Sequence, residues 1–581
     1  MKFSRLCYVL ACLLLLYSGS LFYPKWQQQT TEAQISWDAG GYYWYLPSAF
    51  TYRDMKKMGF KDTVVQKYSP TPPHDFQYAQ KAPNGNYVMK YTMGTALLEM
   101  PTFLVAHAVA AKLGYPADGF SLPYQIAVYV GSILFSAIGL WFLCLVLRRY
   151  YSDMATGATL LLIVWGTNYL NYAGIDAGMS HCWLFGLHAM LLYVTDSYFK
   201  TFKRKYAVLI GLLLGLATLV RPPEIIMGVV PLLWGMDSMR KEAIGQRFLL
   251  WKKHFGDAVV ALVAFAALAS LQLIYWKWAG GSWFVYTYGD QRFVWLQPHL
   301  WRYAFNYDCG WLVYTPLMFF ALAGMVPFFK NGQNKVAVLL FLLLNYYVVA
   351  SWDLWQYGGR AMVQSYAVFS FPLASLIGLL LQKRRWLVVV SPFILVTVYF
   401  NLWWTYQAHK GGLTGSAPTT SKYYWHTIFR YDVPVEMQML RDNKDFYNQP
   451  VVKADTLLAM DFTNKPIVVS GHDSLLVNVP AEKLGKYKWL RATALVHIGQ
   501  KEWGVWDMTM LQLRQYAEGA LKQENTIRIQ RLLQDGQTRN VWLDVRNCQS
   551  NVDNAQVLAK NGNYSGLPLA IYAMWVIGIT E

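Results

Sequence analysis

The stretch LPYQIAVYVGSILFSAIGLWFLCLVL, residues 122–147, decides the fold class of this chain because it is predominantly apolar and carries no charge. A helix needs about 20 such residues to cross roughly 30 Å of hydrocarbon. Comparable runs recur from residue 5 to residue 404 and then stop, and 55% of all residues are hydrophobic. The sequence therefore predicts a polytopic α-helical membrane protein with a C-terminal tail of a different kind.

The other apolar runs mark the remaining membrane helices, which we expect at residues 5–23, 154–173, 181–199, 256–276, 311–329, 336–350, 361–381 and 386–404. Residues 206–235 form a longer run that RPP at 221–223 interrupts. Proline cannot continue the hydrogen-bond ladder of a helix, so we interpret this run as two short helices that meet near the outer surface. Counting them separately predicts about eleven membrane helices.

The formal net charge of +18 is concentrated in basic clusters between the predicted helices, at Arg148–Arg149, Lys200–Lys205, Arg240–Lys253, Lys330–Lys335 and Lys383–Arg385. These clusters fall on one side of the membrane if the helices alternate, as the positive-inside bias requires. The charge therefore indicates membrane orientation rather than binding of nucleic acid. The six cysteines show no CxxC spacing, so neither a disulfide framework nor a zinc cluster is indicated.

The chain is expected to divide near residue 405 into two domains. Residues 1–405 form the membrane domain, and residues 24–121 form a long loop on its outer face. Within this loop, residues 95–113 are long and apolar enough to span, but a crossing there would put the basic clusters outside, so we expect an interfacial helix. Short segments of residues 406–581 alternate apolar and polar side chains between turn residues, at 465–473, 474–498, 525–533, 540–547 and 567–579. This pattern predicts a soluble β-sandwich on the outer face.

Asp38 is the candidate catalytic residue, in the outer-loop segment SWDAGGYYWYLPSAF, residues 36–50. No basic neighbour in the sequence pairs with it, and Gly40 and Gly41 permit close approach of a ligand or of another backbone. A turn or capping role is the alternative.

Further candidates share the predicted outer side. Arg360 precedes a helix, where a cation opposes the helix dipole, and this placement indicates an anionic partner such as phosphate. Arg221 either binds phosphate or satisfies carbonyl groups that the prolines leave free. The aromatic candidates on this side can also be interpreted as the belt of Trp and Tyr residues that lies at membrane interfaces. The predicted phosphate ligands are Arg221, Arg302 and Arg360, and the predicted substrate contacts are Tyr42, Tyr43, Asp176, His181, Trp352, Trp355 and Tyr357.

The order of several motifs resembles the GT-C superfamily of integral-membrane glycosyltransferases, which includes protein O-mannosyltransferases and the lipid A aminoarabinose transferase. The motifs are WDAGGYY (37–43), GMSH (178–181), LATLVRPPEII (216–226), GWLVYTP (310–316) and WQYGGR (355–360). The resemblance covers residues 1–405. Many relatives carry a second acid close to the first-loop aspartate, whereas the nearest upstream acid here is Glu32.

The resemblance implies a bacterial inner-membrane enzyme with a periplasmic site, in which Asp38 is the catalytic base and Arg221 and Arg360 bind lipid phosphate. The implied donor is a polyprenyl-phosphate sugar, and the acceptor is a lipid, a glycan or a protein. No cofactor is required. A divalent metal held by Asp38, Asp176 and His181 stays open as an alternative, although their spacing fits no standard ligand set.

Transfer from a polyprenyl phosphate needs a base for the acceptor hydroxyl and cations for the departing phosphate. Single displacement would invert the anomeric centre. A lipid-linked oligosaccharide polymerase or ligase is an alternative, since it also presents outer arginines. A secondary transporter fits less well, because such proteins often have broken helices in duplicated halves and this sequence shows one break.

Overall fold

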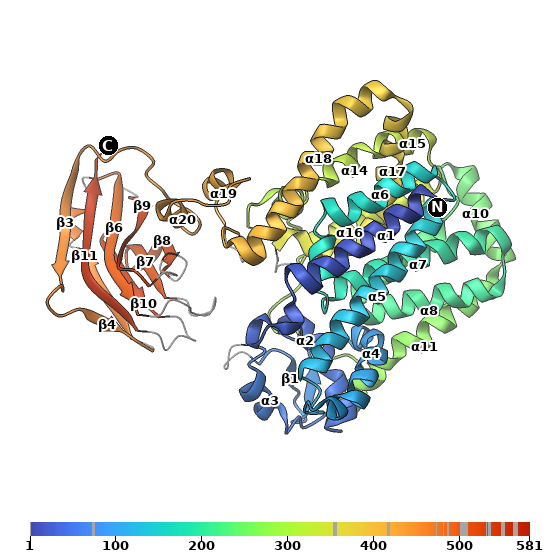
Figure 1. The fold of residues 1–581 in the computed structure, drawn as a ribbon, viewed down its shortest axis with the longest axis horizontal. Coiled ribbons are helices and arrows are strands. Elements are labelled where there is room, and N and C mark those ends of the chain that lie inside the picture. The colour runs from blue at the N-terminus through green and yellow to red at the C-terminus, as the bar shows by residue number, and fades with distance from the viewer. Residues whose placement is uncertain are drawn as a thin grey trace. The chain divides into compact units, whose positions relative to one another are not determined.

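The computed structural model places the chain in two compact units, residues 1–409 and 410–581 (Figure 1). Each unit is described by itself. The structure describes residues 2–71, 76–308, 310–352, 357–414, 419–471, 473–479, 481–484, 487–499, 509–529, 532, 536–547, 552–561 and 568–580.

The first unit is almost entirely helical. Its first part contains α1 (Phe3–Tyr17), η1 (Ser18–Phe22), η2 (Lys25–Gln27), η3 (Thr30–Glu32), α2 (Trp37–Tyr43), η4 (Pro47–Thr51), α3 (Lys61–Tyr68), β1 (Ala79–Lys81), β2 (Tyr87–Met89), α4 (Gly94–Ala110) and η5 (Ala111–Leu113). The middle part contains α5 (Leu122–Leu147), α6 (Asp153–Gly166), η6 (Asn171–Ile175), α7 (Ser180–Thr201), α8 (Arg204–Val220), η7 (Pro222–Gly228), α9 (Val229–Leu233), α10 (Lys241–Lys253) and α11 (Phe255–Gly280).

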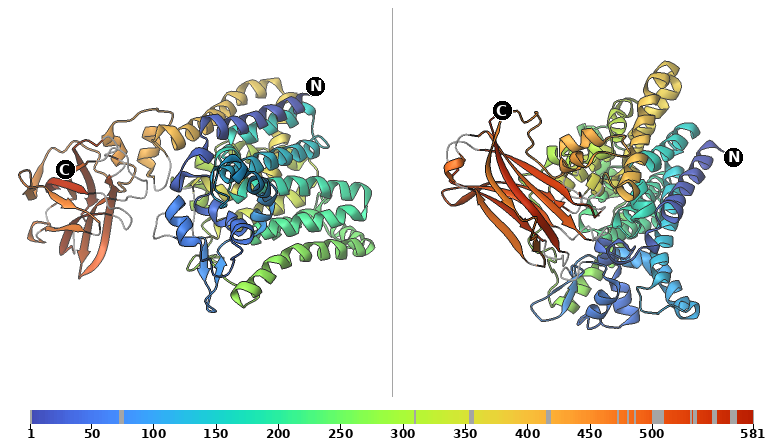
Figure 2. Two further views of the ribbon diagram at one scale, coloured as in Figure 1. Left: turned by 60° about the horizontal axis from the view of Figure 1, so that its bottom comes forward. Right: turned by 60° about the vertical axis from the view of Figure 1, so that its left-hand side comes forward.

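The last part of this unit contains α12 (Leu300–Phe305), α13 (Trp311–Tyr314), α14 (Met318–Ala323), α15 (Met325–Asn331), α16 (Lys335–Ala350), η8 (Tyr357–Ser365), α17 (Tyr366–Gln382), α18 (Arg384–Tyr406) and η9 (Gln407–Gly411), the last of which crosses into the second unit. The long helices lie side by side (Figure 2, left). The elements labelled η are short 3-10 or π-helical turns.

Six helical segments among the described residues are long and apolar enough to cross a membrane, namely Phe3–Gln27, Gly94–Leu113, Leu122–Leu147, Phe255–Gly280, Gly358–Gln382 and Arg384–Gly411. Four shorter apolar helices accompany them. This confirms the prediction of a helical, multi-pass membrane protein, while the count of about eleven helices stays a prediction. The segment at 95–113 is one of the six, so its interfacial placement also stays a prediction.

The predicted interruption at residue 221 is present. Helix α8 ends at Val220, Arg221 is extended with φ −147° and ψ 119°, and the two prolines open η7. Proline causes the break, because a proline at 222 has no N–H for the hydrogen-bond ladder of the helix. It also restricts the residue before it to extended backbone.

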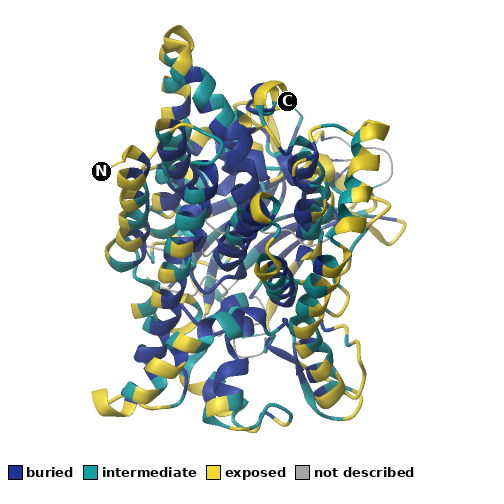
Figure 3. Ribbon diagram, turned by 90° about the vertical axis from the view of Figure 1, so that its right-hand side faces the viewer, coloured by how far each residue is buried: buried dark blue, intermediate teal, exposed yellow. Residues whose placement is uncertain are grey.

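The core of the helical unit lies between α5, α7 and α17, whose inner sides are buried (Figure 3). Figure 3 also shows exposed residues along the outward sides of the helices. A second apolar cluster lies under the loop of residues 24–121, where Trp44 and Tyr78 stack with their ring centroids 5.0 Å apart.

The second unit contains two antiparallel sheets. Their strands are β3 (Ala454–Asp461), β4 (Ile467–Val469), β5 (Ser474–Val479), β6 (Trp489–Ile498), β7 (Met510–Ala517), β8 (Ala520–Arg528), β9 (Arg539–Arg546), β10 (Asn554–Lys560) and β11 (Leu569–Ile579), preceded by α19 (Ser421–Thr427) and α20 (Val435–Met439), with η10 (Ala481–Lys483) between β5 and β6.

The strand orders are β5-β10-β7-β8 and β3-β11-β6-β9, with β4 also paired to β11. Inward residues of both sheets form one apolar cluster, which confirms the predicted antiparallel β structure of the tail. Strands β3, β7 and β10 were not among the segments that the sequence indicated, because their polar side chains weaken the alternation.

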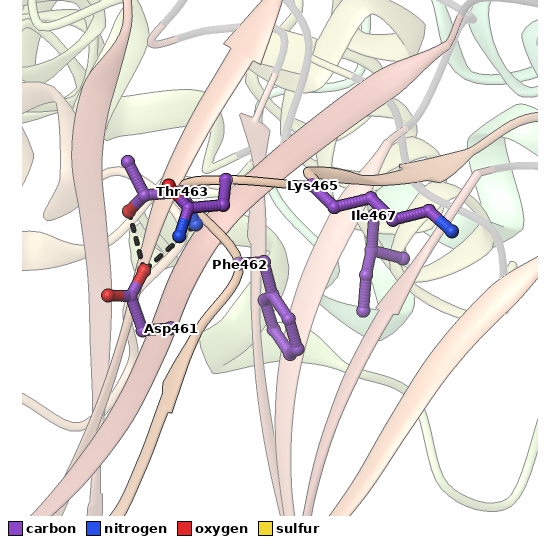
Figure 4. A pocket seen from close by; sticks show the side chains of 6 residues that line it. Asp461, Phe462, Thr463, Lys465 and Ile467 are labelled. Atoms are coloured by element: carbon purple, nitrogen blue, oxygen red, sulfur yellow. Dashed lines mark hydrogen bonds between the residues drawn. The ribbon is translucent and has the colours of Figure 1, made fainter.

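A shallow hollow in this unit lies at the turn between β3 and β4 (Figure 4). Asp461 closes the turn by accepting hydrogen bonds from the backbone N–H and the hydroxyl of Thr463, at 2.8 and 2.5 Å. Phe462 and Ile467 also line the hollow. We assign the hollow no role.

Candidate functional site

Asp38 lies in the first turn of α2, where free backbone N–H groups favour a carboxylate. The residue before it, Trp37, has φ 47°, which is the left-handed region that a bulky side chain seldom adopts. Such strain is tolerated where the surrounding structure fixes the backbone, and it is found preferentially at functional sites. The Asp38 side chain is 15% exposed, so it is accessible from one side.

Both oxygens of the Asp38 carboxylate have partners from distant parts of the chain. The Tyr91 hydroxyl donates to Oδ1 at 2.6 Å, and Arg360 donates from Nη2 to Oδ2 in an ion pair. A carboxylate has about four acceptor sites, so these two bonds orient Asp38 and leave room for a further donor. The anionic partner that the position of Arg360 indicated is therefore Asp38 itself.

The glycines after Asp38 are needed for close packing of aromatic rings. A Cβ on Gly41 would lie 2.3 Å from the Tyr91 ring, and one on Gly40 would lie 2.9 Å from the Tyr78 ring. The sequence left open whether a ligand or a protein group uses this space. The structure fills it with two tyrosines, one of which binds Asp38.

Arg360 is positioned by a tight turn at Gly358 and Gly359, which have φ values of 62° and 60°. Two consecutive left-handed residues favour glycine at both positions. A Cβ on Gly359 would also lie 2.5 Å from the Cβ of Trp311. The Asn168 amide donates to the Gly358 carbonyl at 2.8 Å and fixes the turn from the other side.

Arg221 is the second cation of this region. Its Nη1 is buried and has no hydrogen-bond partner among the described residues. The charges of Arg221 and Arg360 both act on His181, and those of Arg221 and Asp38 both act on Tyr42. A buried guanidinium nitrogen without a partner is costly, and this one belongs to a cation close to the Asp38 site.

Tyr42 and three further aromatic residues form a continuous wall beside Asp38. The ring centroids of Tyr42 and Tyr91 are 4.5 Å apart, those of Tyr91 and Tyr288 are 5.9 Å apart, and those of Tyr288 and Trp352 are 5.5 Å apart. Burial raises the pKa of Tyr42, with Arg221 opposing and Asp38 adding to the effect. Burial also raises the pKa of Tyr91, and the Asp38 charge adds to it. Both hydroxyls are therefore protonated and able to donate.

Tyr91 and Tyr288 were not among the sequence candidates. With 17% aromatic residues in the chain, no local signal distinguishes these two from interfacial or packing tyrosines. Lys90 adds a positive charge here, with its Nζ 5.4 Å from the Tyr91 ring centroid and 5.8 Å from that of Tyr288.

Tyr43 and Asp176 make contacts with other parts of the chain. Tyr43 is 1% exposed, and its hydroxyl donates to the Gly119 carbonyl at 2.6 Å. Asp176 forms an ion pair with Lys25 and accepts from the Asn171 amide at 2.9 Å. Burial alone would raise the pKa of Asp176, but the Lys25 charge and the Asn171 hydrogen bond outweigh it and lower this pKa to about 2.

His181 is 3% exposed, and its Nδ1 lies 3.3 Å from the side-chain oxygen of Gln364. Among the residues that the structure describes, no group of three or more His, Cys, Asp or Glu side chains is arranged to hold a metal ion. The members of the alternative set, Asp38, Asp176 and His181, instead each contact different residues.

The remaining candidates are less informative. Arg302 lies exposed on the short helix α12. Trp352 belongs to the aromatic wall and pairs through its backbone with Phe293. Trp355 lies outside the described residues, as does the side chain of Tyr357.

Comparison with known proteins gives distant matches to solved structures. Neither a family model nor a curated protein sequence matches the chain. The oligosaccharyltransferase of Archaeoglobus fulgidus in the apo form is 13% identical over 73% of this chain and 57% of its own, with a TM-score of 0.41. Arabinosyltransferase EmbB from Mycobacterium smegmatis is 9% identical over 94% of this chain and 64% of its own, with a TM-score of 0.34. The chain thus spans about three fifths of the length of the solved structures that it matches.

Proposed function

We propose that the chain is an inverting membrane glycosyltransferase that moves a sugar from a polyprenyl-phosphate donor to an acceptor hydroxyl. The observation that carries this proposal is the grouping of a partly exposed carboxylate, Asp38, with Arg360 and with Arg221. The buried Nη1 of Arg221 has no hydrogen-bond partner in the described part of the chain. A base next to two guanidinium groups suits a reaction in which an alcohol loses a proton and a phosphate departs.

Asp38 accepts the proton of the acceptor hydroxyl as that oxygen attacks the anomeric carbon. Tyr91 and Arg360 hold the carboxylate, and a positioned base of this kind contributes about 10²- to 10⁴-fold. The bond between the anomeric carbon and the phosphate oxygen breaks in the same displacement, so the configuration inverts. The phosphate leaves as an anion and needs no proton.

Arg221 and Arg360 bind the donor phosphate. Arg360 donates one N–H to Asp38. Because a guanidinium group has five N–H donors, several can still bind phosphate oxygens. Planar guanidinium groups match phosphate geometry through paired hydrogen bonds. Arg302, which is exposed on α12, is a further proposed phosphate ligand.

The aromatic wall provides the surface for the transferred sugar or the lipid head group. Tyr42, Tyr91, Tyr288 and Trp352 offer ring faces and, in the tyrosines, hydroxyl donors. We place this site at the periplasmic side of a bacterial inner membrane, which is the side opposite the basic clusters. The β unit of residues 410–581 is proposed to lie on the same side and to assist acceptor capture.

The test uses the full-length protein in lipid nanodiscs with a radiolabelled polyprenyl-phosphate sugar and a panel of lipid, glycan and peptide acceptors. Transfer of label to an acceptor, with inverted configuration by NMR, is the expected result. Binding of farnesyl phosphate, a short polyprenyl phosphate, should exceed binding of farnesol by at least about tenfold if two guanidinium groups hold the phosphate. Equal binding of the two probes would contradict the phosphate site. Uptake of a sugar into sealed vesicles without any transfer would identify a transporter instead.

A further inference from the structure

A buried polar cluster behind Arg221 was not indicated by the sequence. It consists of His188 on α7, Glu224 on η7 and Gln364 on η8, and these side chains are 0–4% exposed. The Gln364 amide donates to Oε1 of Glu224 at 2.9 Å, and Nε2 of His188 lies 3.2 Å from Oε2 of Glu224. Gln364 follows Arg360 by one turn, and Glu224 follows Arg221 by three residues, so the cluster joins both arginine-bearing segments.

The proton positions follow from the partners. Nδ1 of His188 lies 3.1 Å from the backbone carbonyl of Gln364, which can only accept, so Nδ1 carries a hydrogen. The opposite nitrogen, Nε2, and Oε2 of Glu224 face each other at the distance of an ion pair, and neither atom has a hydrogen-bond partner among the described residues. Two lone pairs would repel at this distance, and therefore one further proton lies between them. Whichever atom carries it, His188 and Glu224 together have no net charge.

This neutrality matters for Arg221, whose charge acts on Glu224. Without His188, an ionised Glu224 would be an uncompensated anion three residues from Arg221. It would compete with a phosphate-bearing ligand for the guanidinium group of Arg221. With its charge compensated by the His188 proton, Glu224 leaves the positive charge of Arg221 available. This agrees with the buried Arg221 Nη1, which meets no hydrogen-bond partner within the residues that the structure describes.

We propose that His188 is a positioning residue that neutralises Glu224 and thereby keeps Arg221 available for a phosphate-bearing ligand. This inference rests on the proposed function, since it concerns the same phosphate site. It adds a residue that acts through Glu224 and does not itself touch the ligand.

The test measures farnesyl phosphate binding to the full-length protein in nanodiscs. His188→Gln removes the ionisable ring and leaves Glu224 as an uncompensated carboxylate. Binding should weaken by at least about tenfold, because a unit charge is added near the phosphate site. The double variant His188→Gln/Glu224→Gln should regain affinity to within about threefold of wild type, because the added charge is gone. A role in packing alone predicts no such rescue.

Ser132→Ala is the matched control, since Ser132 is fully buried in the same unit and bonds to Cys182 outside the cluster. It should bind the probe like wild type.

If His188→Gln does not fold, Glu224→Gln decides the question: affinity at or above the wild-type value supports the proposal, and a tenfold loss overturns it. Weak binding in the folded double variant also overturns it. If Arg221→Ala and Arg360→Ala both bind farnesyl phosphate like wild type, the proposed phosphate site is wrong. If these two variants fail to bind it while His188→Gln binds it like wild type, only the inference about His188 is refuted.

Discussion

Arg360 donates a hydrogen bond to the carboxylate of Asp38 across 322 positions of sequence. The pair joins α2, in the loop of residues 24–121, to the turn before α17. One arginine thereby fixes the proposed base and presents its remaining N–H groups to the proposed phosphate. The roles of the two residues can be separated by experiment, because donor binding requires the charge of Arg360 and does not require that of Asp38.

Asp38→Asn should lower the transfer rate by at least about 10²-fold, the contribution expected of a general base. Farnesyl phosphate binding should be unchanged or tighter, because the substitution removes a negative charge next to Arg360. Steady-state transfer and equilibrium binding on the same preparation test this. A wild-type transfer rate in the folded variant would make Asp38 a structural residue.

Arg360→Ala should have the opposite profile, with donor binding weakened by about 1.5 to 3 kcal/mol for a lost charge-assisted hydrogen bond. Arg360→Lys should restore only part of the affinity, because an ammonium group lacks the planar fork. Isothermal calorimetry with farnesyl phosphate measures both. Unchanged affinity in the alanine variant would remove Arg360 from the phosphate site.

Tyr91→Phe should reduce the turnover number while leaving donor affinity within about twofold, because only the hydrogen bond that orients Asp38 is lost. A loss of about 1 kcal/mol, equivalent to roughly fivefold in rate, is expected for one such bond. Tyr43→Phe is the control, because it also removes one buried hydroxyl hydrogen bond, the one to the Gly119 carbonyl, which is not a bond to Asp38. Equal rates in the two variants would show that Tyr91 does not orient the base.

Gly359→Ala should destabilise the protein by about 1 to 3 kcal/mol through backbone strain alone, and more through the clash with Trp311. Gly378→Ala, within α17, meets no atom within 4 Å and should be neutral or stabilising by about 0.5 to 1 kcal/mol. Thermal unfolding in detergent compares the two. Similar stabilities would contradict the turn geometry.

The Lys25–Asp176 pair should stabilise the fold over most of the pH range. The folded pKa of Asp176 is about 2, below its ordinary value of 3.8, so its contribution is complete above the ordinary pKa and is lost as the pH falls through 2. The stability difference between wild type and Asp176→Asn should stay constant from about pH 8 to pH 5 and shrink only below about pH 4. A difference that changes between pH 8 and pH 5 would disprove the assignment.

Several features follow from the sequence because they depend on local chemistry. Apolar runs of membrane length predict helices wherever they occur, as residues 122–147 and 256–276 show. Proline predicts the break after Val220 because the missing N–H acts on its own helix. Period-2 alternation predicts β6, β9 and β11 for the same reason, and it misses β7, in which Gln512 and Gln515 are buried.

The candidate site was only partly predictable. Asp38, Arg221 and Arg360 could be selected because charged groups near apolar segments are uncommon and costly. Their partners could not be selected, because Tyr91 and Tyr288 are two of many aromatic residues and become distinct only through contact. Asp176, chosen by its position in an outer loop, pairs instead with Lys25.

The sequence by itself determined the membrane class, the positions of the long apolar helices, the break at Arg221 and the β character of the tail, because hydrophobic length, proline and alternation act over a few neighbouring residues. It did not determine that the helix expected at 311–329 divides into α13, α14 and α15. Only the tertiary structure decided that Asp38 pairs with Arg360, that Gly41 makes room for the ring of Tyr91, and that His188 faces Glu224. These contacts join residues that are far apart in the chain, and their energies depend on distance and burial, which exist only once the helices have packed.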